Sequence, residues 1–240
     1  MELLSTGNPK TLKGETQGFM TYILHLAPAD VSGYNTCPKA SKGCKAACLN
    51  TAGRGGMFRK GESTNVIQKA RIRKTKFFFE NRDDFLTTLV SDITKAIKQA
   101  ARKGYTAVFR LNGTSDISWE KYIIPGTDKN IFGLFPNVQF YDYTAILGRK
   151  VSNVANYHLT FSAKEDNQKE VEKAINMGMN VSIVFDKLPA EYNGIKVIDA
   201  DEHDLRFLDP RGVICGLKAK GKAKKDDSGF VRRMIPLAVA

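Results

Sequence analysis

The feature that most limits the fold of this chain is a series of short apolar runs, rich in β-branched and aromatic residues, with helical patterns between them. The runs are residues 21–26, 107–111, 138–141, 157–161, 181–185, 197–198 and 212–217. Continuous apolar runs of this kind are typical of strands that are buried on both faces of a parallel sheet. Because strands that alternate with helices require crossover connections, we predict a parallel α/β fold.

The strongest helical pattern covers residues 83–103. Apolar side chains recur there every four residues, which places them on one face of a helix. They are Phe85, Leu89, Ile93 and Ile97. Gly104 directly follows the pattern as a stop signal. Weaker patterns predict further helices at residues 62–79 and 166–177.

Nothing in the sequence divides the chain, which has no internal repeat and no low-complexity linker. We therefore predict a single α/β domain over residues 1–240. The strand candidates are numerous enough for a complete or partial TIM-like barrel, and an open, doubly wound sheet is the alternative.

The composition is that of a soluble globular protein, with 42% hydrophobic and 26% charged residues. No stretch approaches the roughly 18 apolar residues that span a bilayer, and the first residues lack the basic and apolar regions of a signal peptide. We therefore expect no membrane association and a cytoplasmic location. In that reducing compartment, cysteines serve as metal ligands or catalytic groups more often than as disulfides.

Three of the four cysteines lie close together in a polar loop, residues 33–56, after the first predicted strand. Cys37, Cys44 and Cys48 form a C-x6-C-x3-C pattern. One helical turn would project the sulfur atoms of Cys44 and Cys48 from the same face, and the preceding loop is long enough to bring Cys37 to that point. Ordinary buried cysteines are normally scattered on apolar faces, so this pattern predicts a metal centre.

The residues around these cysteines suit a metal centre as well. Gly33 and Gly43 allow the backbone to approach an inorganic group closely. Lys39, Lys42 and Lys45 add positive potential, which we expect to lower the thiol pKa values and to offset the charge of a thiolate-bound cluster.

The identity of the metal depends on the fourth ligand. Structural zinc usually has four protein ligands, whereas only three cysteines are local here. The candidates for a fourth ligand are Cys215, His25, His158 and His203, and we select Cys215. Three cysteines can also hold a [4Fe-4S] cluster with one iron open to a substrate or cofactor, and Cys215 would close that cluster. We favour iron–sulfur, with zinc as the alternative.

Several segments resemble a family of bacteriophage and prophage proteins, which implies a host bacterial cytoplasm as the location. They are residues 33–56, 110–116, 140–144, 204–210 and 216–221. More distantly, a three-cysteine loop after the first strand is similar to radical S-adenosylmethionine (SAM) proteins. That resemblance implies an α/β barrel and a SAM molecule bound at the open iron.

Polar residues follow several of the predicted strands, and in parallel α/β folds the strand ends gather at one functional edge. Asn112, Thr114 and Asp116 follow the second strand, where radical SAM proteins have a polar, glycine-containing motif for the cofactor. We therefore predict that these three residues bind a cofactor. The alternative is that they cap turns.

The formal charge of +12 favours polyanionic partners. Basic residues concentrate in a C-terminal segment, residues 218–240, and residues 71–79 mix cations with aromatic side chains. Such runs can contact the phosphates of a nucleic acid, although a solvated surface is the plainer alternative. No Gly-Lys-[Ser/Thr] follows residues 53–56, so nucleotide hydrolysis is unsupported.

Together these features predict an iron–sulfur protein on a barrel-like scaffold, without specifying a reaction. If the protein is an enzyme, radical or redox chemistry is expected. The alternatives are a metal-stabilised nucleic-acid-binding protein without catalysis, and a structural or host-interaction protein whose metal fixes a loop.

Overall fold

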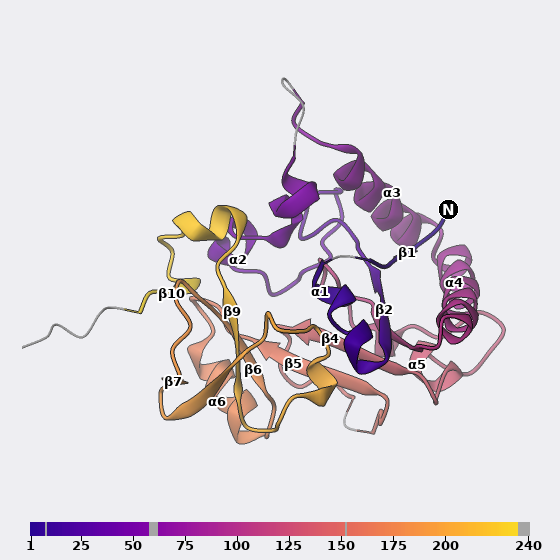
Figure 1. The fold of residues 1–240 in the computed structure, drawn as a ribbon. Coiled ribbons are helices and arrows are strands. Elements are labelled where there is room, and N and C mark those ends of the chain that lie inside the picture. Colours follow the sequence, from indigo (N-terminus) through magenta and orange to yellow (C-terminus); the bar gives the residue numbers. More distant parts are fainter. Residues whose placement is uncertain (8, 58–61, 152, 235–240) are drawn as a thin grey trace, which may run out of the picture.

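A computed structural model describes residues 1–7, 9–57, 62–151 and 153–234, and it contains one mixed sheet. The strand order is β1-β2-β3-β4-β5-β6-β9-β8-β7, and β10 also pairs with β6 (Figure 1). The strands are β1 (Leu4–Ser5), β2 (Phe19–Leu24), β3 (Thr106–Arg110), β4 (Gln139–Thr144), β5 (Tyr157–Ser162), β6 (Val181–Phe185), β7 (Glu191–Tyr192), β8 (Ile195–Asp199), β9 (Ile214–Lys218) and β10 (Val231–Arg232). Pairing is parallel throughout from β2 to β8, and antiparallel at β1 and β7.

Every predicted apolar run contributes to a strand, so the parallel α/β fold is confirmed. The complete barrel is not confirmed, because the sheet of the described residues ends at β1 and β7 and does not close on itself. The structure is compatible with the open-sheet alternative. From β2 to β6 the strands lie in chain order, and the order then reverses at β9 and β8.

Helices connect the strands and lie beside the sheet. The α-helices are α1 (Pro9–Leu12), α2 (Lys42–Ala46), α3 (Val66–Glu80), α4 (Arg82–Arg102), α5 (Ile131–Leu134) and α6 (Gln168–Asn176). The 3-10 helices are η1 (Glu15–Gln17), η2 (Leu49–Thr51), η3 (Gly53–Gly56), η4 (Trp119–Lys121), η5 (Arg206–Leu208) and η6 (Gly221–Lys225). Within the described ranges, none of these helices is long and apolar enough to cross a membrane.

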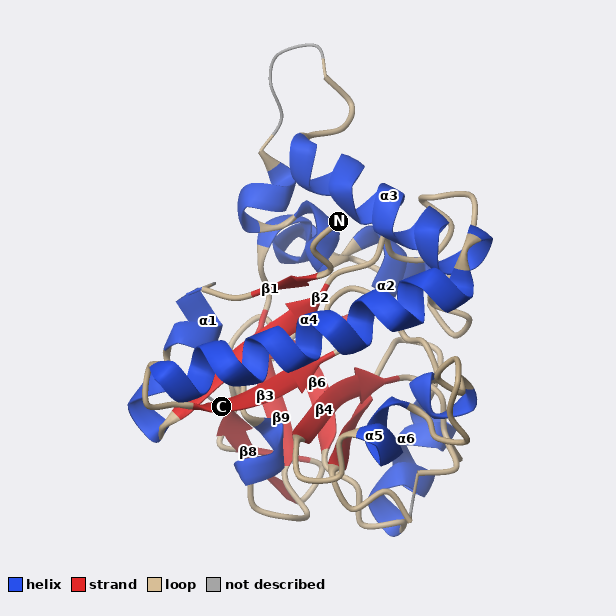
Figure 2. Cartoon of the chain, turned by 90° about the vertical axis from the view of Figure 1, so that its right-hand side faces the viewer, coloured by secondary structure: helices blue, strands red, loops and turns tan. Residues whose placement is uncertain are grey.

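Helix α4 confirms the strongest helical prediction. Figure 2 shows this helix lying across the strands. Its apolar stripe is buried against them, and Leu89 and Ile93 are fully inaccessible. Burying one such side chain stabilises the fold by about 1.5–3 kcal/mol. Gly104 follows the helix with a φ of 78°, a left-handed conformation that glycine adopts without strain.

The two faces of the sheet carry different sets of residues, because side chains alternate along a strand. Phe109 and Phe140 belong to the apolar core on the side of α4. The opposite side, which we call the inner face, carries Ile23, Arg110 and Tyr143 among other residues. This inner face positions the candidate site.

Candidate functional site

A cavity of about 400 Å³ lies on the inner face, at the carboxyl ends of the parallel strands. Side chains from β2, β3, β4, β5, β6 and β9 line it, together with the cysteine loop. Cys37, Cys44 and Cys48 are all among these lining residues. The structure therefore brings the three predicted ligands to one place, at the edge of the sheet where function was expected.

Each cysteine reaches the cavity from a different local structure. The Cys37 Sγ accepts a 3.3 Å hydrogen bond from the Ala29 backbone N–H. Cys44 lies within α2, but that helix ends at Ala46, so Cys48 is outside it and instead caps η2. The prediction that one helical turn carries both thiols is therefore wrong in detail, although both sulfur atoms still face the cavity.

Glu165, which follows β5, holds the cysteine loop in place. Its carboxylate accepts 2.7 Å hydrogen bonds from the Ser41 hydroxyl and from the Gly43 N–H. A Cβ at Gly43 would lie only 2.2 Å from the Ser228 Oγ, so this close approach requires glycine. Sequence reasoning missed Glu165, and its position just after a strand was the one signal that could have found it.

The three thiols are half-buried, and their surroundings disfavour the charged thiolate form. Burial raises the pKa of Cys44 to about 12, with a smaller contribution from the two neighbouring thiols. Burial also raises the pKa values of Cys37 and Cys48. The expectation that nearby lysines lower these pKa values is wrong, because burial is the largest effect at all three thiols and raises the pKa of each. Lys45 instead pairs with Asp30 at 3.1 Å.

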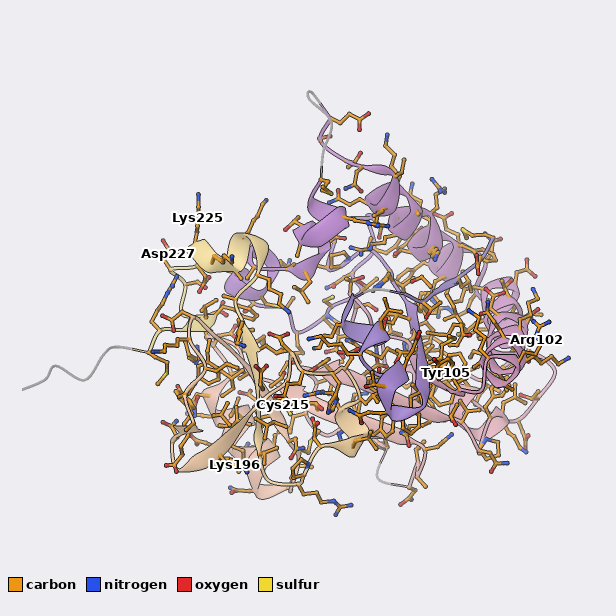
Figure 3. All side chains as sticks on the ribbon, in the orientation of Figure 1. Arg102, Tyr105, Lys196, Cys215, Lys225 and Asp227 are labelled. Carbon is orange, nitrogen blue, oxygen red and sulfur yellow. The ribbon has the colours of Figure 1, made fainter. Side chains whose placement is uncertain are left out.

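The structure does not bring Cys215 to the other cysteines. This residue lies on β9, outside the lining of the cavity, and its Sγ donates to the Asp209 Oδ2 at 3.4 Å (Figure 3). Of the histidines proposed as a fourth ligand, His25 lines the cavity. In the part of the chain that the structure describes, no group of three His, Cys, Asp or Glu side chains is arranged to hold a metal ion.

Asn112, Thr114 and Asp116 line the same cavity as the cysteines, as the strand-end argument predicts. Their polar atoms, however, make hydrogen bonds within the protein that stabilise the loop to which these residues belong. The Asn112 Oδ1 accepts hydrogen bonds from the Ser115 hydroxyl, the Ile117 N–H and the Trp119 indole. The Thr114 hydroxyl donates to the Leu26 carbonyl, and Asp116 accepts from Thr144 and Ala145. Cofactor binding by these side chains stays a prediction.

A second group of polar residues forms the floor of the cavity, and sequence reasoning missed it. Arg110 donates a 2.6 Å hydrogen bond to Asp204, and Lys10 pairs with the same carboxylate at 3.1 Å. The guanidinium of Arg110 lies 5.1 Å from the centre of the Tyr143 ring. The alternation of side chains along β3 and β4 was the one sequence signal that could have placed Arg110 and Tyr143 on the inner face.

The sheet, the cysteine loop and the cavity define an α/β protein with a thiol-lined site. The chain belongs to the Gene product 88 family, whose sequence model matches residues 2–234. This match agrees with the resemblance to phage-type proteins and gives no support to the more distant resemblance to radical SAM proteins. No curated protein and no solved structure matches the chain.

Proposed function

We propose that the chain binds an iron–sulfur cluster through Cys37, Cys44 and Cys48 at the edge of the cavity. The observation that carries this proposal is the convergence of three thiols on one cavity at the carboxyl ends of the strands. A donor set made of thiols suits iron–sulfur clusters, zinc and other soft metals better than magnesium or calcium.

The number of local thiols favours a cluster over a single zinc ion, because structural zinc usually has four protein ligands and three cysteines line this cavity. The ligands of one zinc ion all bind the same atom, whereas the thiolates of a cluster bind different iron atoms and stand further apart. With three cysteines as ligands, one iron of a [4Fe-4S] cluster would be open, and SAM at that position is what the distant resemblance to radical SAM proteins implies.

Two features of the protein bear on such a centre. Glu165 fixes the loop that carries Cys44 through two hydrogen bonds. Burial raises the pKa values of the three thiols, so binding of metal would release protons and would strengthen as pH rises.

Iron and sulfide analysis of protein purified without oxygen tests the proposal. We expect about four irons and a similar amount of sulfide per chain. Cys44→Ser should lose most of this iron, whereas the matched Cys215→Ala variant should keep it, because Cys215 lies outside the cavity lining. Circular dichroism of both variants separates loss of metal from loss of fold.

Three results would contradict the proposal. Colourless wild-type protein with one zinc ion per chain would exclude the cluster. Retention of iron by a folded Cys44→Ser variant would exclude this ligand set. Loss of iron from a folded Cys215→Ala variant would show that a fourth cysteine is needed, and no iron would then be open to SAM.

Nucleic-acid binding is the second candidate function, and the position of the basic C-terminal segment favours it. Helix η6 packs on the cysteine loop, where Ala223 and Ala47 share a small apolar cluster. Lys222, Lys224 and Lys225 are exposed on this helix, and Figure 3 labels Lys225. Residues 235–240 of the predicted basic segment lie outside the described residues.

Salt-dependent binding to single-stranded DNA tests this second function. Changing Lys222, Lys224 and Lys225 to Gln should weaken binding and reduce the slope of log K against log salt by about 2. The control variant changes the lysines Lys95, Lys98 and Lys103 on and just after α4 to Gln, which removes the same charge elsewhere. Equal effects of the two triple variants would show that the net charge, and not η6, governs binding.

A further inference from the structure

The lysines and arginines that line the cavity differ in their partners. Most of them pair with a carboxylate at 2.6–3.1 Å: Lys10 and Arg110 with Asp204, Lys164 with Asp166, Lys218 with Asp199, and Lys220 with Asp201. Arg71 of α3 also lines the cavity, but among the described residues it pairs with no carboxylate. The positions outside the described residues carry no Asp or Glu. The charge of Arg71 therefore has no acidic side chain of this chain as its partner.

Asn50 holds Arg71 beside Cys48. The Arg71 Nη1 donates a 2.7 Å hydrogen bond to the Asn50 Oδ1, and the Asn50 backbone N–H donates to the Cys48 Sγ at 3.5 Å. Asn50 is buried, so this link is part of the packed wall of the cavity. The cation and the thiol both line that cavity.

The guanidinium of Arg71 is charged at neutral pH. Burial lowers its pKa, but an arginine in a protein keeps its proton throughout the neutral range. His25, in the same cavity, reports this charge: its pKa is lowered to about 3 by burial and then by the charges of Arg71, Arg110 and Lys74. The positive potential of Arg71 therefore reaches groups inside the cavity.

We propose that Arg71 is the counter-charge of the cluster at the three thiols and raises its reduction potential, an inference that rests on the proposed function. A [4Fe-4S] cluster held by three thiolates has a net negative charge, and uptake of one electron adds a second negative charge. A cation beside Cys48 stabilises the reduced form more than the oxidised form. Arg71 acts in this way through its charge and not as a ligand.

Three variants separate the charge of Arg71 from its packing. Arg71→Gln removes the charge and keeps an amide that can donate to Asn50. Arg71→Lys keeps the charge and loses the planar guanidinium. Arg73→Gln is the matched control, because Arg73 lies on the same helix but is exposed.

The experiment titrates protein purified without oxygen with dithionite, which supplies the electron, and follows the cluster by its visible absorbance. Arg71→Gln should shift the one-electron equilibrium about tenfold toward the oxidised form, because a nearby unit charge has an effect of this order at an effective dielectric constant of about 20. This shift lowers the potential by about 59 mV. Arg71→Lys and Arg73→Gln should keep a potential close to that of the wild type.

An unchanged potential in an Arg71→Gln variant that holds its cluster would overturn this inference and leave the proposed function intact. An Arg71→Lys variant that behaves like Arg71→Gln would overturn it too, since the shape of the guanidinium and not its charge would then matter. Loss of the cluster from folded Arg71→Gln but not from Arg71→Lys would support it. Wild type without iron would overturn the proposed function, and this inference with it. Iron and sulfide analysis of the same preparations distinguishes these results.

Discussion

Arg110 on β3 is joined to Asp204 by a 2.6 Å hydrogen bond across 94 residues of sequence. The Asp204 side chain is 2% exposed, and Lys10 of α1 pairs with it as well. This carboxylate therefore ties the segment after β8 and the N-terminal helix to the inner face of the sheet. Burial would raise the pKa of Asp204, but the charges of Arg110 and Lys10 lower it to about 2.

Asp204→Asn should change both the stability and its dependence on pH. At neutral pH we expect a loss of about 3–5 kcal/mol, because two buried cations lose their partner. In the wild type the folded pKa lies below the unfolded value of 3.8, so this ion pair stabilises the protein above that pH and the benefit disappears as pH falls toward about 2. The pH-dependent part amounts to about 2 kcal/mol.

Urea unfolding between pH 2 and pH 5 measures this effect. The acid-dependent loss should be smaller in Asp204→Asn than in the wild type. The surface variant Asp227→Asn should follow the wild-type profile. If the free energy of unfolding fell as steeply with acid in Asp204→Asn as in the wild type, the assignment of this pH dependence to Asp204 would be wrong.

Arg149→Leu should be strongly destabilising, because Arg149 neutralises a buried carboxylate. Its guanidinium donates two hydrogen bonds to Glu120, at 3.1 and 2.5 Å, and the two side chains are 2% and 6% exposed. Removing the arginine leaves Glu120 buried and unpaired, which costs about 3–5 kcal/mol.

Chemical denaturation compares this variant with Arg102→Leu at the exposed end of α4 (Figure 3). The exposed variant should differ from the wild type by less than about 0.5 kcal/mol. Similar losses in the two variants would mean that the buried pair contributes no more than a surface charge.

Gly113→Ala should destabilise the loop that borders the cavity. A Cβ at this position would lie 2.3 Å from the His25 Nδ1 and 2.4 Å from the Ile23 Cγ2. Relief of such overlap in a packed region costs about 1–3 kcal/mol. Gly133→Ala in α5 is the control, since its nearest neighbour lies at 3.6 Å and the added methyl fits. Thermal unfolding should show a lower Tm for Gly113→Ala only.

Much of the fold was predictable because its signals are local. The apolar run of β6 and the four-residue periodicity of α4 record burial directly in the sequence, and both elements formed as expected. The two-residue strand β1 and the four-residue helix α5 were missed, since elements this short carry no periodicity. Asn65 shows how a local cap sets a boundary: its side chain accepts from the Gln68 N–H, so α3 begins later than predicted.

The candidate site also has one part that the sequence indicates and another part that it does not. Cys37, Cys44 and Cys48 lie within 12 positions of one another in the chain, and their spacing alone indicated a shared site. No such spacing in the sequence reveals the polar residues on the floor of the cavity. Arg110 and Asp204 are distant in the sequence, and each reads there as an ordinary charged residue beside a strand or turn.

The sequence by itself determined the parallel α/β class, the main helix and the grouping of three cysteines, because each depends on residues close together in the chain. Only the tertiary structure decided that the sheet of the described residues ends at β1 and β7 without closing, that Cys215 bonds to Asp209, and that burial raises the pKa of the Cys44 thiol. Strand pairing and desolvation depend on which distant segments pack together, and no local pattern records that.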